Sequence, residues 1–488
     1  MGEVRARGAF LDLTPLRISA AYRRLWLGGA LSGLGHQVAV VAVLFQVWEM
    51  TRSPFWVAAI GIAQAVPMIA LGLVGGPLAD VLDRRRVALA ATGGQAVAAL
   101  ALGAQLVLGF YPLPLLLALL SLQTACNALG APSRRTFITR LMPREQVAAG
   151  IALHMISFQA AMMVGPAVGG LLLGVASPAV CYLVNAAALS ISWWTVRALP
   201  PMPPERQAGA PEAAALADRP ADRPADRPAD RPADRPAAPG SAHIAPTGTG
   251  TGRAADHGRA LTAYPRARTS PLARLRRRTR TALVMLGEGV DAVRRDPVLR
   301  GSFLLDLAAT LLAFPVALFP MVNQELFGGD PRTLGLFLTC VAVGGVGAGL
   351  ASGLVTRRAR LGVVQLVAVG VWGVALLGFG LAALGGLAGV ALATLVVAGA
   401  ADTVSVTSRA AMVQLATPDS HLGRVSSVEH VIGVSGPDIG NARAGLVAGL
   451  TTPAWSALLG ALGCLAVGAW VALTHREVAA FRVGDRDA

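Results

Sequence analysis

Six ionisable side chains that lie within or beside otherwise apolar segments of the sequence could do chemistry. They are His36, Asp306, Asp402, Arg409, Asp438 and Arg443. An ionisable group among apolar side chains is costly, and such groups commonly mark paths for protons, ions or charged substrates. The same residue types also form structural ion pairs, so each group needs its own assessment.

Three of these groups have a chemistry suited to proton exchange. An unperturbed histidine titrates near neutral pH, and His36 lies about twelve residues into the first apolar segment, near the centre of a membrane-spanning helix. A neutral, hydrogen-bonded packing histidine explains His36 equally well. Asp306 and Asp402 fall in the cytoplasmic third of their predicted spans. For both carboxylates a proton site and a gate or structural salt bridge remain open interpretations.

The other three groups could form pairs or bind an anion. Arg409 follows Asp402 closely and could pair with it or with the neighbouring loop. Asp438 and Arg443 occupy the middle of the eleventh apolar segment, either as a structural pair or with Arg443 meeting an anionic substrate. The four cysteines all fall within predicted spans, which favours buried thiols over a metal site. We therefore expect no metal and no cofactor.

The segments that carry these groups have the length of membrane-spanning helices. The chain of 488 residues is 54% hydrophobic and 14% charged, whereas soluble proteins carry about 25% charged residues. Apolar segments near the ~20 residues that cross a bilayer as a helix recur throughout. They are Leu25–Val47, Val57–Val74, Val87–Phe110, Leu113–Leu129, Met155–Val175, Val180–Val196, Phe303–Val322, Thr333–Val355, Val363–Leu384, Leu387–Val406, Val425–Leu450 and Trp455–Leu473. We predict an all-α membrane protein with twelve transmembrane helices in two six-helix bundles.

Arginine supplies all of the basic charge, because the sequence contains no lysine and has a formal net charge of +15. Arginines cluster before the first span and in alternate loops, whereas the other loops hold little beyond Arg52 and Arg332. The positive-inside rule then places both termini and the central loop in the cytoplasm. This distribution argues against a nucleic-acid partner. The first span is too long for a cleavable signal peptide.

The central region divides the chain into its predicted parts. An N-terminal bundle over residues 1–199 precedes a linker over 200–270, in which "ADRP" repeats five times and proline recurs too often for a helix. Residues 271–298 form a predicted amphipathic helix, with Leu283, Leu286, Val290 and Val293 on one face and arginines at both ends. Such a helix should lie at the cytoplasmic interface and contact anionic lipids. The C-terminal bundle covers residues 299–488.

The two halves contain an internal repeat that points to a known family. "SRRTFITRLMP" from Ser133 and "SRAAMVQLATP" from Ser408 each follow the fourth span of their half. Duplicated six-helix halves are the plan of the major facilitator superfamily. "GGPLADVLDRRR" also resembles that family's loop between helices two and three. The matching residues are Gly76, Leu78, Ala79, Asp80, Arg84 and Arg85, whereas Val81 and Asp83 depart from the pattern.

By this resemblance Asp80 has a gating role. A carboxylate at the cytoplasmic end of helix two can accept hydrogen bonds from the N-terminus of a neighbouring helix, whose dipole favours negative charge. The eleventh helix begins on that side of the membrane. The resemblance implies a latch that holds the two halves together in the outward-open state.

A Gly-Pro pair lies near the middle of both the fifth and the eleventh span. "GPAVGG" resembles a motif on helix five of proton-driven exporters in this superfamily, and "GPDIGN" is its counterpart. The motif residues are Gly165, Pro166, Gly169 and Gly170 in the fifth span and Gly436, Pro437 and Gly440 in the eleventh. Glycines four residues apart allow close backbone approach. We expect these helices to meet the opposite half there. Ordinary small-residue packing is the alternative.

Within the superfamily the chain resembles the enterobactin exporter and transmembrane secretion effector branch. The resemblance implies a monomeric transporter of the bacterial cytoplasmic membrane that exports a siderophore, drug or other amphipathic small molecule, with the proton as coupling ion. The fourth span lacks the arginine frequent in proton antiporters, which leaves the coupling ion open. An uptake carrier and a membrane scaffold or sensor are the alternatives. An enzyme is not expected, since the histidines lack a His-Glu-x-x-His spacing.

Overall fold

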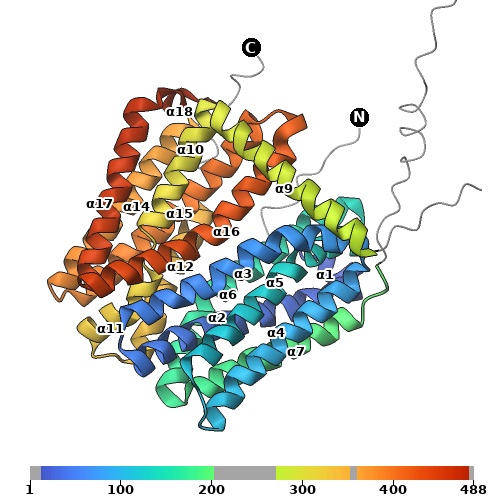
Figure 1. Cartoon of the computed structure of the whole chain (residues 1–488), viewed down its shortest axis with the longest axis horizontal. Coiled ribbons are helices and arrows are strands. Elements are labelled where there is room, and N and C mark those ends of the chain that lie inside the picture. Colours follow the sequence, from blue (N-terminus) through green and yellow to red (C-terminus); the bar gives the residue numbers. More distant parts are fainter. Residues whose placement is uncertain (1–11, 203–270, 352–359, 483–488) are drawn as a thin grey trace, which may run out of the picture. The chain divides into compact units, whose positions relative to one another are not determined.

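The computed structural model describes residues 12–202, 271–351 and 360–482, and its regular elements are helices that form two groups (Figure 1). The N-terminal bundle comprises α1 (Thr14–Ile18), α2 (Ala20–Thr51), α3 (Pro54–Val81), α4 (Arg84–Val107), α5 (Leu113–Leu141), η1 (Arg144–Gln146), α6 (Val147–Val175) and α7 (Pro178–Arg197). The C-terminal bundle comprises α10 (Pro297–Leu307), η2 (Ala308–Leu312), η3 (Val316–Leu318), α11 (Phe319–Phe327), α12 (Pro331–Leu350), α14 (Leu361–Leu384), α15 (Ala388–Ala416), α16 (Asp419–Leu450), α17 (Pro453–Thr474) and α18 (Arg476–Ala480). A further helix, α9, covers Pro271–Arg295.

The two ends of the bundles need names because the contacts below differ between them. We call the end that holds α1, α9 and α18 the near end (Figure 1). The opposite end, which holds the α2–α3 and α16–α17 connections, is the far end. Most of the predicted linker (200–270) lies outside the described residues, as do residues 352–359 between α12 and α14.

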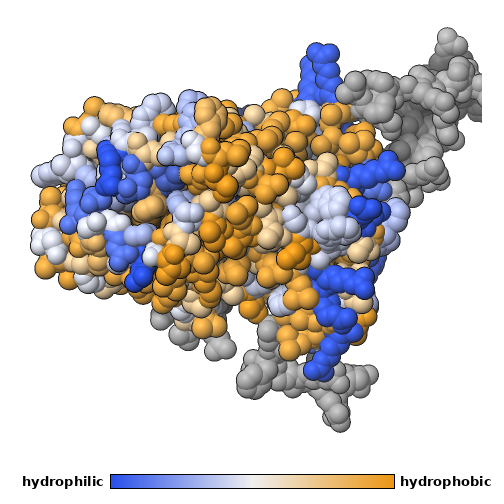
Figure 2. Space-filling view, turned by 90° about the horizontal axis from the view of Figure 1, so that it is seen from below, coloured by the Kyte–Doolittle hydropathy of each residue, from blue (hydrophilic) through white to orange (hydrophobic). Residues whose placement is uncertain are grey.

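The helices have the length and composition of membrane spans. Eleven helical stretches within the described residues are long and apolar enough to cross a bilayer, with α10 to α11 counted together as Pro297–Phe327. Figure 2 shows apolar residues across the middle of one face, with hydrophilic residues toward both sides of the view. The all-α membrane fold is therefore confirmed. The remaining long helix, α16, has 32 residues but carries several charged side chains, so it remains a predicted twelfth span.

Short polar side chains fix where several helices begin. The Ser19 hydroxyl accepts the backbone N–H of Tyr22 at the start of α2. The Asp83 carboxylate accepts the N–H groups of Arg85 and Arg86 at the start of α4. Each cap satisfies donors that have no partner within the helix. Asp83 thus stands where the family's loop has glycine because it caps α4.

The bundles touch each other along two helix pairs. α3 of the N-terminal bundle packs along α16, and α6 packs along α12. Within the N-terminal bundle α2 packs on α6 and α7, and α3 packs on α5. Within the C-terminal bundle α14 packs on α15 and α17, and α12 packs on α15. Most of the contact between the two bundles is therefore made by α3, α6, α12 and α16.

The seventh predicted span is broken, which the apolar pattern did not indicate. The α-helix ends at Leu307, continues as the π-helical turn η2, and resumes as α11 at Phe319. Pro315 and Pro320 lack backbone donors and disfavour a continuous helix here. The side-chain oxygen of Asn441 on α16 accepts the N–H of Ala317 at 2.9 Å. A side chain from a neighbouring helix thus satisfies a backbone group that the break would leave unpaired.

We expect the Asn441→Ala substitution to destabilise this break. Without the acceptor, the Ala317 N–H loses its partner in a partly buried setting, which costs about 1–3 kcal/mol. The measurement is the thermal unfolding temperature of the purified protein in detergent. Asn441→Asp is the control, because it keeps an acceptor oxygen and should lose less stability. Equal unfolding temperatures for wild type and Asn441→Ala would contradict this role.

Candidate functional site

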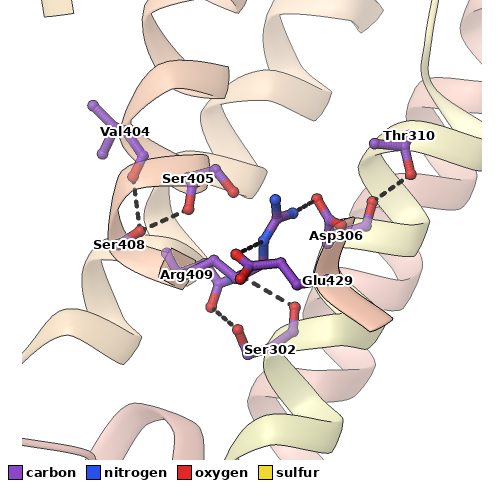
Figure 3. Close-up of polar contacts among 9 residues, drawn as sticks. Ser302, Asp306, Thr310, Val404, Ser405, Ser408, Arg409 and Glu429 are labelled. Carbon is purple, nitrogen blue, oxygen red and sulfur yellow. Dashed lines mark hydrogen bonds and ion pairs between the residues drawn. The ribbon is translucent and has the colours of Figure 1, made fainter. Parts of the chain in front are cut away.

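The buried acidic and basic side chains Asp306 and Arg409 meet the partly buried Glu429 in a three-residue cluster of the C-terminal bundle (Figure 3). Asp306 lies on α10, Arg409 on α15 and Glu429 on α16. The Arg409 guanidinium contacts Asp306 Oδ1 and lies 3.5 Å, through Nε, from Glu429 Oε1. The side chains of Asp306 and Arg409 are only 6% and 5% exposed, and that of Glu429 is 22% exposed. We call these three residues the charge cluster.

Polar groups beside the charge cluster are bonded among themselves. The Ser302 hydroxyl donates to Gln365 Oε1 at 2.8 Å, and Gln365 Nε2 donates to the Ser302 carbonyl at 3.1 Å. The Thr310 hydroxyl donates to the Asp306 backbone carbonyl at 2.8 Å. These bonds fix the position of α10 against α14 and hold the first turn of the π-helical segment. Asp306 therefore lies on a helix that hydrogen bonds join to α14.

The partner of Arg409 differs from the sequence-based expectation. Asp402 and Arg409 are seven residues apart on α15, which is about 10 Å along the helix axis. Side chains that pair on one helix are three or four residues apart. Arg409 instead meets Asp306 of the neighbouring α10 and Glu429 of α16, which is neither of the two alternatives, Asp402 or the adjoining loop, that the sequence left open. Glu429 was not predicted as a partner, because a charge so near the start of a predicted span looks like part of the preceding loop.

His36 lies on the interior side of its helix. α2 packs against α6 and α7, and the exposed Leu27 and Leu31 point outward between them. Because successive residues are rotated by about 100°, His36 lies about 180° from Leu27 and about 140° from Leu31. The His36 side chain is exposed. Its imidazole is therefore accessible from the inside of the bundle, in mid-helix, and apart from the charge cluster.

Asp438 and Arg443 do not form a pair. No ion pair joins them in the described structure, and their positions on α16 are about 140° apart around the helix. The Arg443 guanidinium reaches toward Gly460 on α17. The backbone carbonyl of Asp438 touches Gly61 on α3 of the other bundle. The Asp438 side chain is only partly buried, at a point where the two halves meet.

The Gly-Pro motif of α6 makes contacts in two directions. A side chain at Gly169 would meet the backbone of Val38 at 3.1 Å, on α2 of the same bundle. Gly165 faces Gln37 and Leu34 of α2 in the same way. Because these two glycines are one turn apart, they lie on one face, and that face belongs to their own half. The expectation that Gly169 contacts the opposite half is wrong.

The next motif glycine makes the contact between bundles. A side chain at Gly170 would meet the carbonyl of Pro331 at 3.0 Å, that of Arg332 at 2.9 Å and the backbone of Gly335 at 3.2 Å, all on α12. Gly335 in turn faces the carbonyl of Pro166. The backbones of α6 and α12 thus touch directly. Gly169 and Gly170 are adjacent, so they point about 100° apart around α6. Gly169 contacts α2 of its own bundle, whereas Gly170 contacts α12 of the other bundle.

The α16 motif repeats the first arrangement. Gly436 faces the side chain of Thr310, and Gly440 faces the Thr310 carbonyl and Phe314 beside the break in the seventh span. These are again contacts within one half, so the expectation of contact with the opposite half is wrong for Gly440 too. Different α16 glycines contact α3, namely Gly445 against Ala58 and Pro54 and Gly449 against Phe55.

The close contacts between the halves gather toward the far end. They join the second half of α6 to the start of α12 and the first part of α3 to the second part of α16. At the far end itself, Arg52 Nη1 donates to Gln324 Oε1 of α11 at 2.6 Å. These positions close the two halves against each other at that end.

Toward the near end, one face of α6 is exposed. The first part of α6 exposes Ile151, His154, Met155, Ile156 and Phe158. With about 100° per residue these side chains cover more than half of the helix circumference. On its other side this part of α6 contacts α2, because Tyr22 Oη and Trp26 Nε1 donate to the carbonyls of Gly150 and Leu153. The close α6–α12 backbone contacts therefore lie toward the far end, whereas α9 packs on both α16 and α3 at the near end.

The loop between α3 and α4 is tied to its own bundle. Asp83 Oδ2 accepts the N–H of Met202 at 3.1 Å, and Arg85 Nη2 donates to the Arg197 carbonyl at the end of α7. The Arg84 N–H bonds the Met202 carbonyl at 3.1 Å. Gly76 has open space around it. The side chain of Asp80 lies outside the described structure, so its latch remains a prediction.

Comparisons with known proteins agree on one superfamily. The sequence model of the Major Facilitator Superfamily matches residues 25–437. The enterobactin exporter EntS of Shigella boydii serotype 4 is 25% identical over 478 residues, covering 97% of this chain and 96% of that protein. EntS of Escherichia coli (strain SMS-3-5) is 25% identical over 476 residues, with the same coverage.

Solved transporters share the fold at low sequence identity. The nucleoside transporter NupG superposes with a TM-score of 0.62 at 12% identity, covering 93% of this chain and 98% of that one. A POT family transporter in complex with 5-aminolevulinic acid gives 0.64 at 10% identity, covering 94% and 97%. A D-xylose-proton symporter gives 0.60 at 13% identity, covering 92% and 96%.

We expect Gly170→Leu to disfavour the arrangement that is closed at the far end. The added side chain meets α12 backbone, and overpacking of this kind costs about 1–3 kcal/mol. If that cost falls on one of two alternating states, their ratio changes by roughly five- to 150-fold. The measurement is the accessibility of single cysteines from each side of the membrane.

Two variants separate this effect from simple loss of stability. Gly349→Leu on α12 is the matched control, because nothing surrounds that glycine. Gly169→Leu should lower the unfolding temperature without a one-sided change in accessibility, since its contact lies within one bundle. Wild-type accessibility in Gly170→Leu at normal expression would remove this glycine from the mechanism.

Proposed function

Because the chain belongs to the major facilitator superfamily and is a multi-pass transporter rather than an enzyme, we propose that it exports an amphipathic small molecule by alternating access. The observation that carries the proposal is the close backbone contact between the bundles toward the far end. α6–α12 and the adjoining parts of α3 and α16 close the far end, whereas the near end exposes the first part of α6. A carrier open to one side at a time has this geometry.

The direction of transport and the substrate class are part of the proposal. The relatives named enterobactin exporters support export of a siderophore, drug or similar amphipathic molecule. The Gly-Pro motif at Gly165 and Pro166 supports the same direction. The arginine-rich near end supports a cytoplasmic location for both termini and a place in the bacterial cytoplasmic membrane. An uptake carrier is the alternative, because the D-xylose-proton symporter has the same fold.

We further propose proton antiport. His36 faces the bundle interior, and Asp402 and Asp438 are partly buried carboxylates in mid-helix. Ionisable groups at such depth commonly carry protons or bind charged substrates. Arg443, which is also partly buried, is the candidate contact for an anionic part of the substrate.

Anionic lipid is the proposed partner of α9. Leu286, Val290 and Val293 pack on the C-terminal bundle, while Leu283 and Val284 are exposed. Three exposed arginines lie one or two helical turns before this pair and therefore on the same face of α9. They are Arg276, Arg277 and Arg280. Apolar side chains beside arginines on one face suit the boundary between headgroups and acyl chains of an anionic bilayer.

The transport proposal predicts energy-dependent export of enterobactin, the first probe suggested by the relatives. Export-deficient bacteria that express the protein should retain less enterobactin than cells with an empty vector, and a protonophore should abolish the difference. Accumulation inside the expressing cells would favour uptake instead. Export that survives the protonophore but stops on ATP depletion would exclude proton antiport.

The lipid proposal predicts a loss of anionic lipid in an Arg276→Gln, Arg277→Gln, Arg280→Gln triple variant. Each arginine near an anionic surface contributes about 1 kcal/mol. Native mass spectrometry of protein from mixed phosphatidylglycerol and phosphatidylcholine nanodiscs should show fewer retained phosphatidylglycerol molecules. Arg52→Gln at the far end is the control. Equal retention by the triple variant and wild type would contradict the assignment.

A further inference from the structure

An open cavity lies on the N-terminal bundle at the far end. It has a volume of about 750 Å³, within the range of roughly 300–1,000 Å³ that small-molecule sites occupy. The last turns of α2 form one wall, and the end of α4, the α4–α5 loop and the first residue of α7 form the rest. All of its lining residues belong to one bundle, so it is separate from the space between the halves. We call it the far-end cavity.

A Schellman motif at the end of α4 shapes the rim of the far-end cavity. The Gly109 N–H donates to the Leu106 carbonyl at 3.2 Å, and the Phe110 N–H donates to the Gln105 carbonyl at 3.0 Å, which are the two bonds that define this motif. Gly109 has a φ of +68°, a conformation that residues with a side chain rarely adopt. The turn brings Phe110 and Tyr111 to the cavity, where they remain 67% and 43% exposed. Two aromatic rings are thus left open to a ligand.

The described residues that line the far-end cavity include one acid and no base. The acid is Glu49, and Phe45 and Met50 line the same wall of α2. Each Glu49 carboxylate oxygen accepts a hydrogen bond from Arg52 Nη2 at 2.8 Å and keeps a further lone-pair direction. The Glu49 side chain is 38% exposed. A carboxylate is therefore accessible in a cavity whose other walls are mostly apolar or aromatic.

A buried amide adds a second polar group to the far-end cavity. Gln46 is 3% exposed, and its Oε1 accepts a hydrogen bond from the Tyr182 hydroxyl at 2.7 Å. This bond orients the amide, and Gln46 Nε2 then has Met50 Sδ at 3.6 Å as its partner. A thioether sulfur is a weak acceptor, and both Gln46 and Met50 line the cavity. An oxygen atom of a ligand would be a better acceptor for this amide N–H.

Arg52 has other partners and can therefore give up Glu49 to a ligand. Arg52 Nη1 donates to Gln324 Oε1 at 2.6 Å, and the guanidinium lies 6.0 Å from the centre of the Trp48 ring. The Arg52 side chain is also 51% exposed, so water can solvate it. A second cation could thus take the place of Arg52 beside the Glu49 carboxylate without leaving a buried, unpaired charge.

These groups together select one class of ligand. A carboxylate attracts a cation, aromatic faces attract the same charge, and a thioether with apolar walls accepts an apolar body. We propose that the far-end cavity binds an amphipathic organic cation, with Glu49 as its counter-ion. The positive-inside rule predicts that the far end faces outward, so this cation would enter from outside the cell. The proposal does not rest on the proposed transport function, because the cavity lies within one bundle.

The test is calorimetric titration of tetraphenylphosphonium into the purified full protein in a neutral detergent. Triphenylphosphine oxide, which is neutral, is the matched ligand control and should not bind. We expect Glu49→Gln to weaken binding of the cation about fivefold, the upper range for a partly exposed ion pair. Arg52→Gln should strengthen binding, because it removes the cation that competes for Glu49. Glu325→Gln and Arg332→Gln replace exposed charges at the same end and should leave the dissociation constant unchanged.

The outcomes separate this site from a site between the bundles and from a lipid site. Opposite shifts in Glu49→Gln and Arg52→Gln support the proposal. Binding that is unchanged in both variants, or lost in Asp402→Asn or Asp438→Asn instead, would overturn it. Thermal unfolding of each variant confirms that lost binding does not reflect a lost fold. Native mass spectrometry covers the lipid alternative: phosphatidylcholine retained by wild type and lost in Glu49→Gln, without binding of tetraphenylphosphonium, would assign the cavity to a lipid headgroup and reject the proposal.

Discussion

Close approach of helix backbones is the constraint on which the arrangement of the two halves depends. In an apolar surrounding, helices gain little hydrophobic free energy from association, so their contacts depend on packing and on small residues. Gly170 and Gly335 let α6 and α12 touch backbone to backbone, and Gly61 and Gly445 do the same for α3 and α16. Any residue with a side chain at these positions would force the halves apart.

The apolar surrounding also constrains the buried polar side chains. A buried guanidinium without a carboxylate would be strongly destabilising, so Arg409 requires Asp306. Asp306 alone balances the charge of Arg409, and Glu429 is a second carboxylate beside the same guanidinium. In the other half, Arg134 occupies the matching place in the repeat and donates to Asn127 Oδ1 at 2.5 Å. Among the described side chains, the two matching arginines therefore differ in their contacts, an amide oxygen in one half and two carboxylates in the other.

The sequence predicted the membrane fold well, because a span is a local property of composition and length. Helix pairs and ion partners depend on rotation about each helix axis, and one residue changes that rotation by about 100°. Gly169 and Gly170 are neighbours in the motif, yet one contacts α2 and the other α12. Asp306 and Arg409 are more than a hundred residues apart, so spacing could not reveal their contact. The Gly-Pro pattern predicted where close helix contacts occur along the chain, but not which neighbouring helix each glycine contacts.

Three polar or small residues of α16 contact three different neighbours. Glu429 meets α15, Asn441 meets the break in the seventh span, and Gly445 meets α3. Replacing these residues by leucine would give a more apolar span but would remove the acceptor, the ion pair and the backbone contact together. α3, α6 and α12 also contact both bundles and remain apolar. The polar side chains of α16 therefore follow from the particular groups that they meet, an arginine and an unpaired backbone N–H, rather than from a place between the halves.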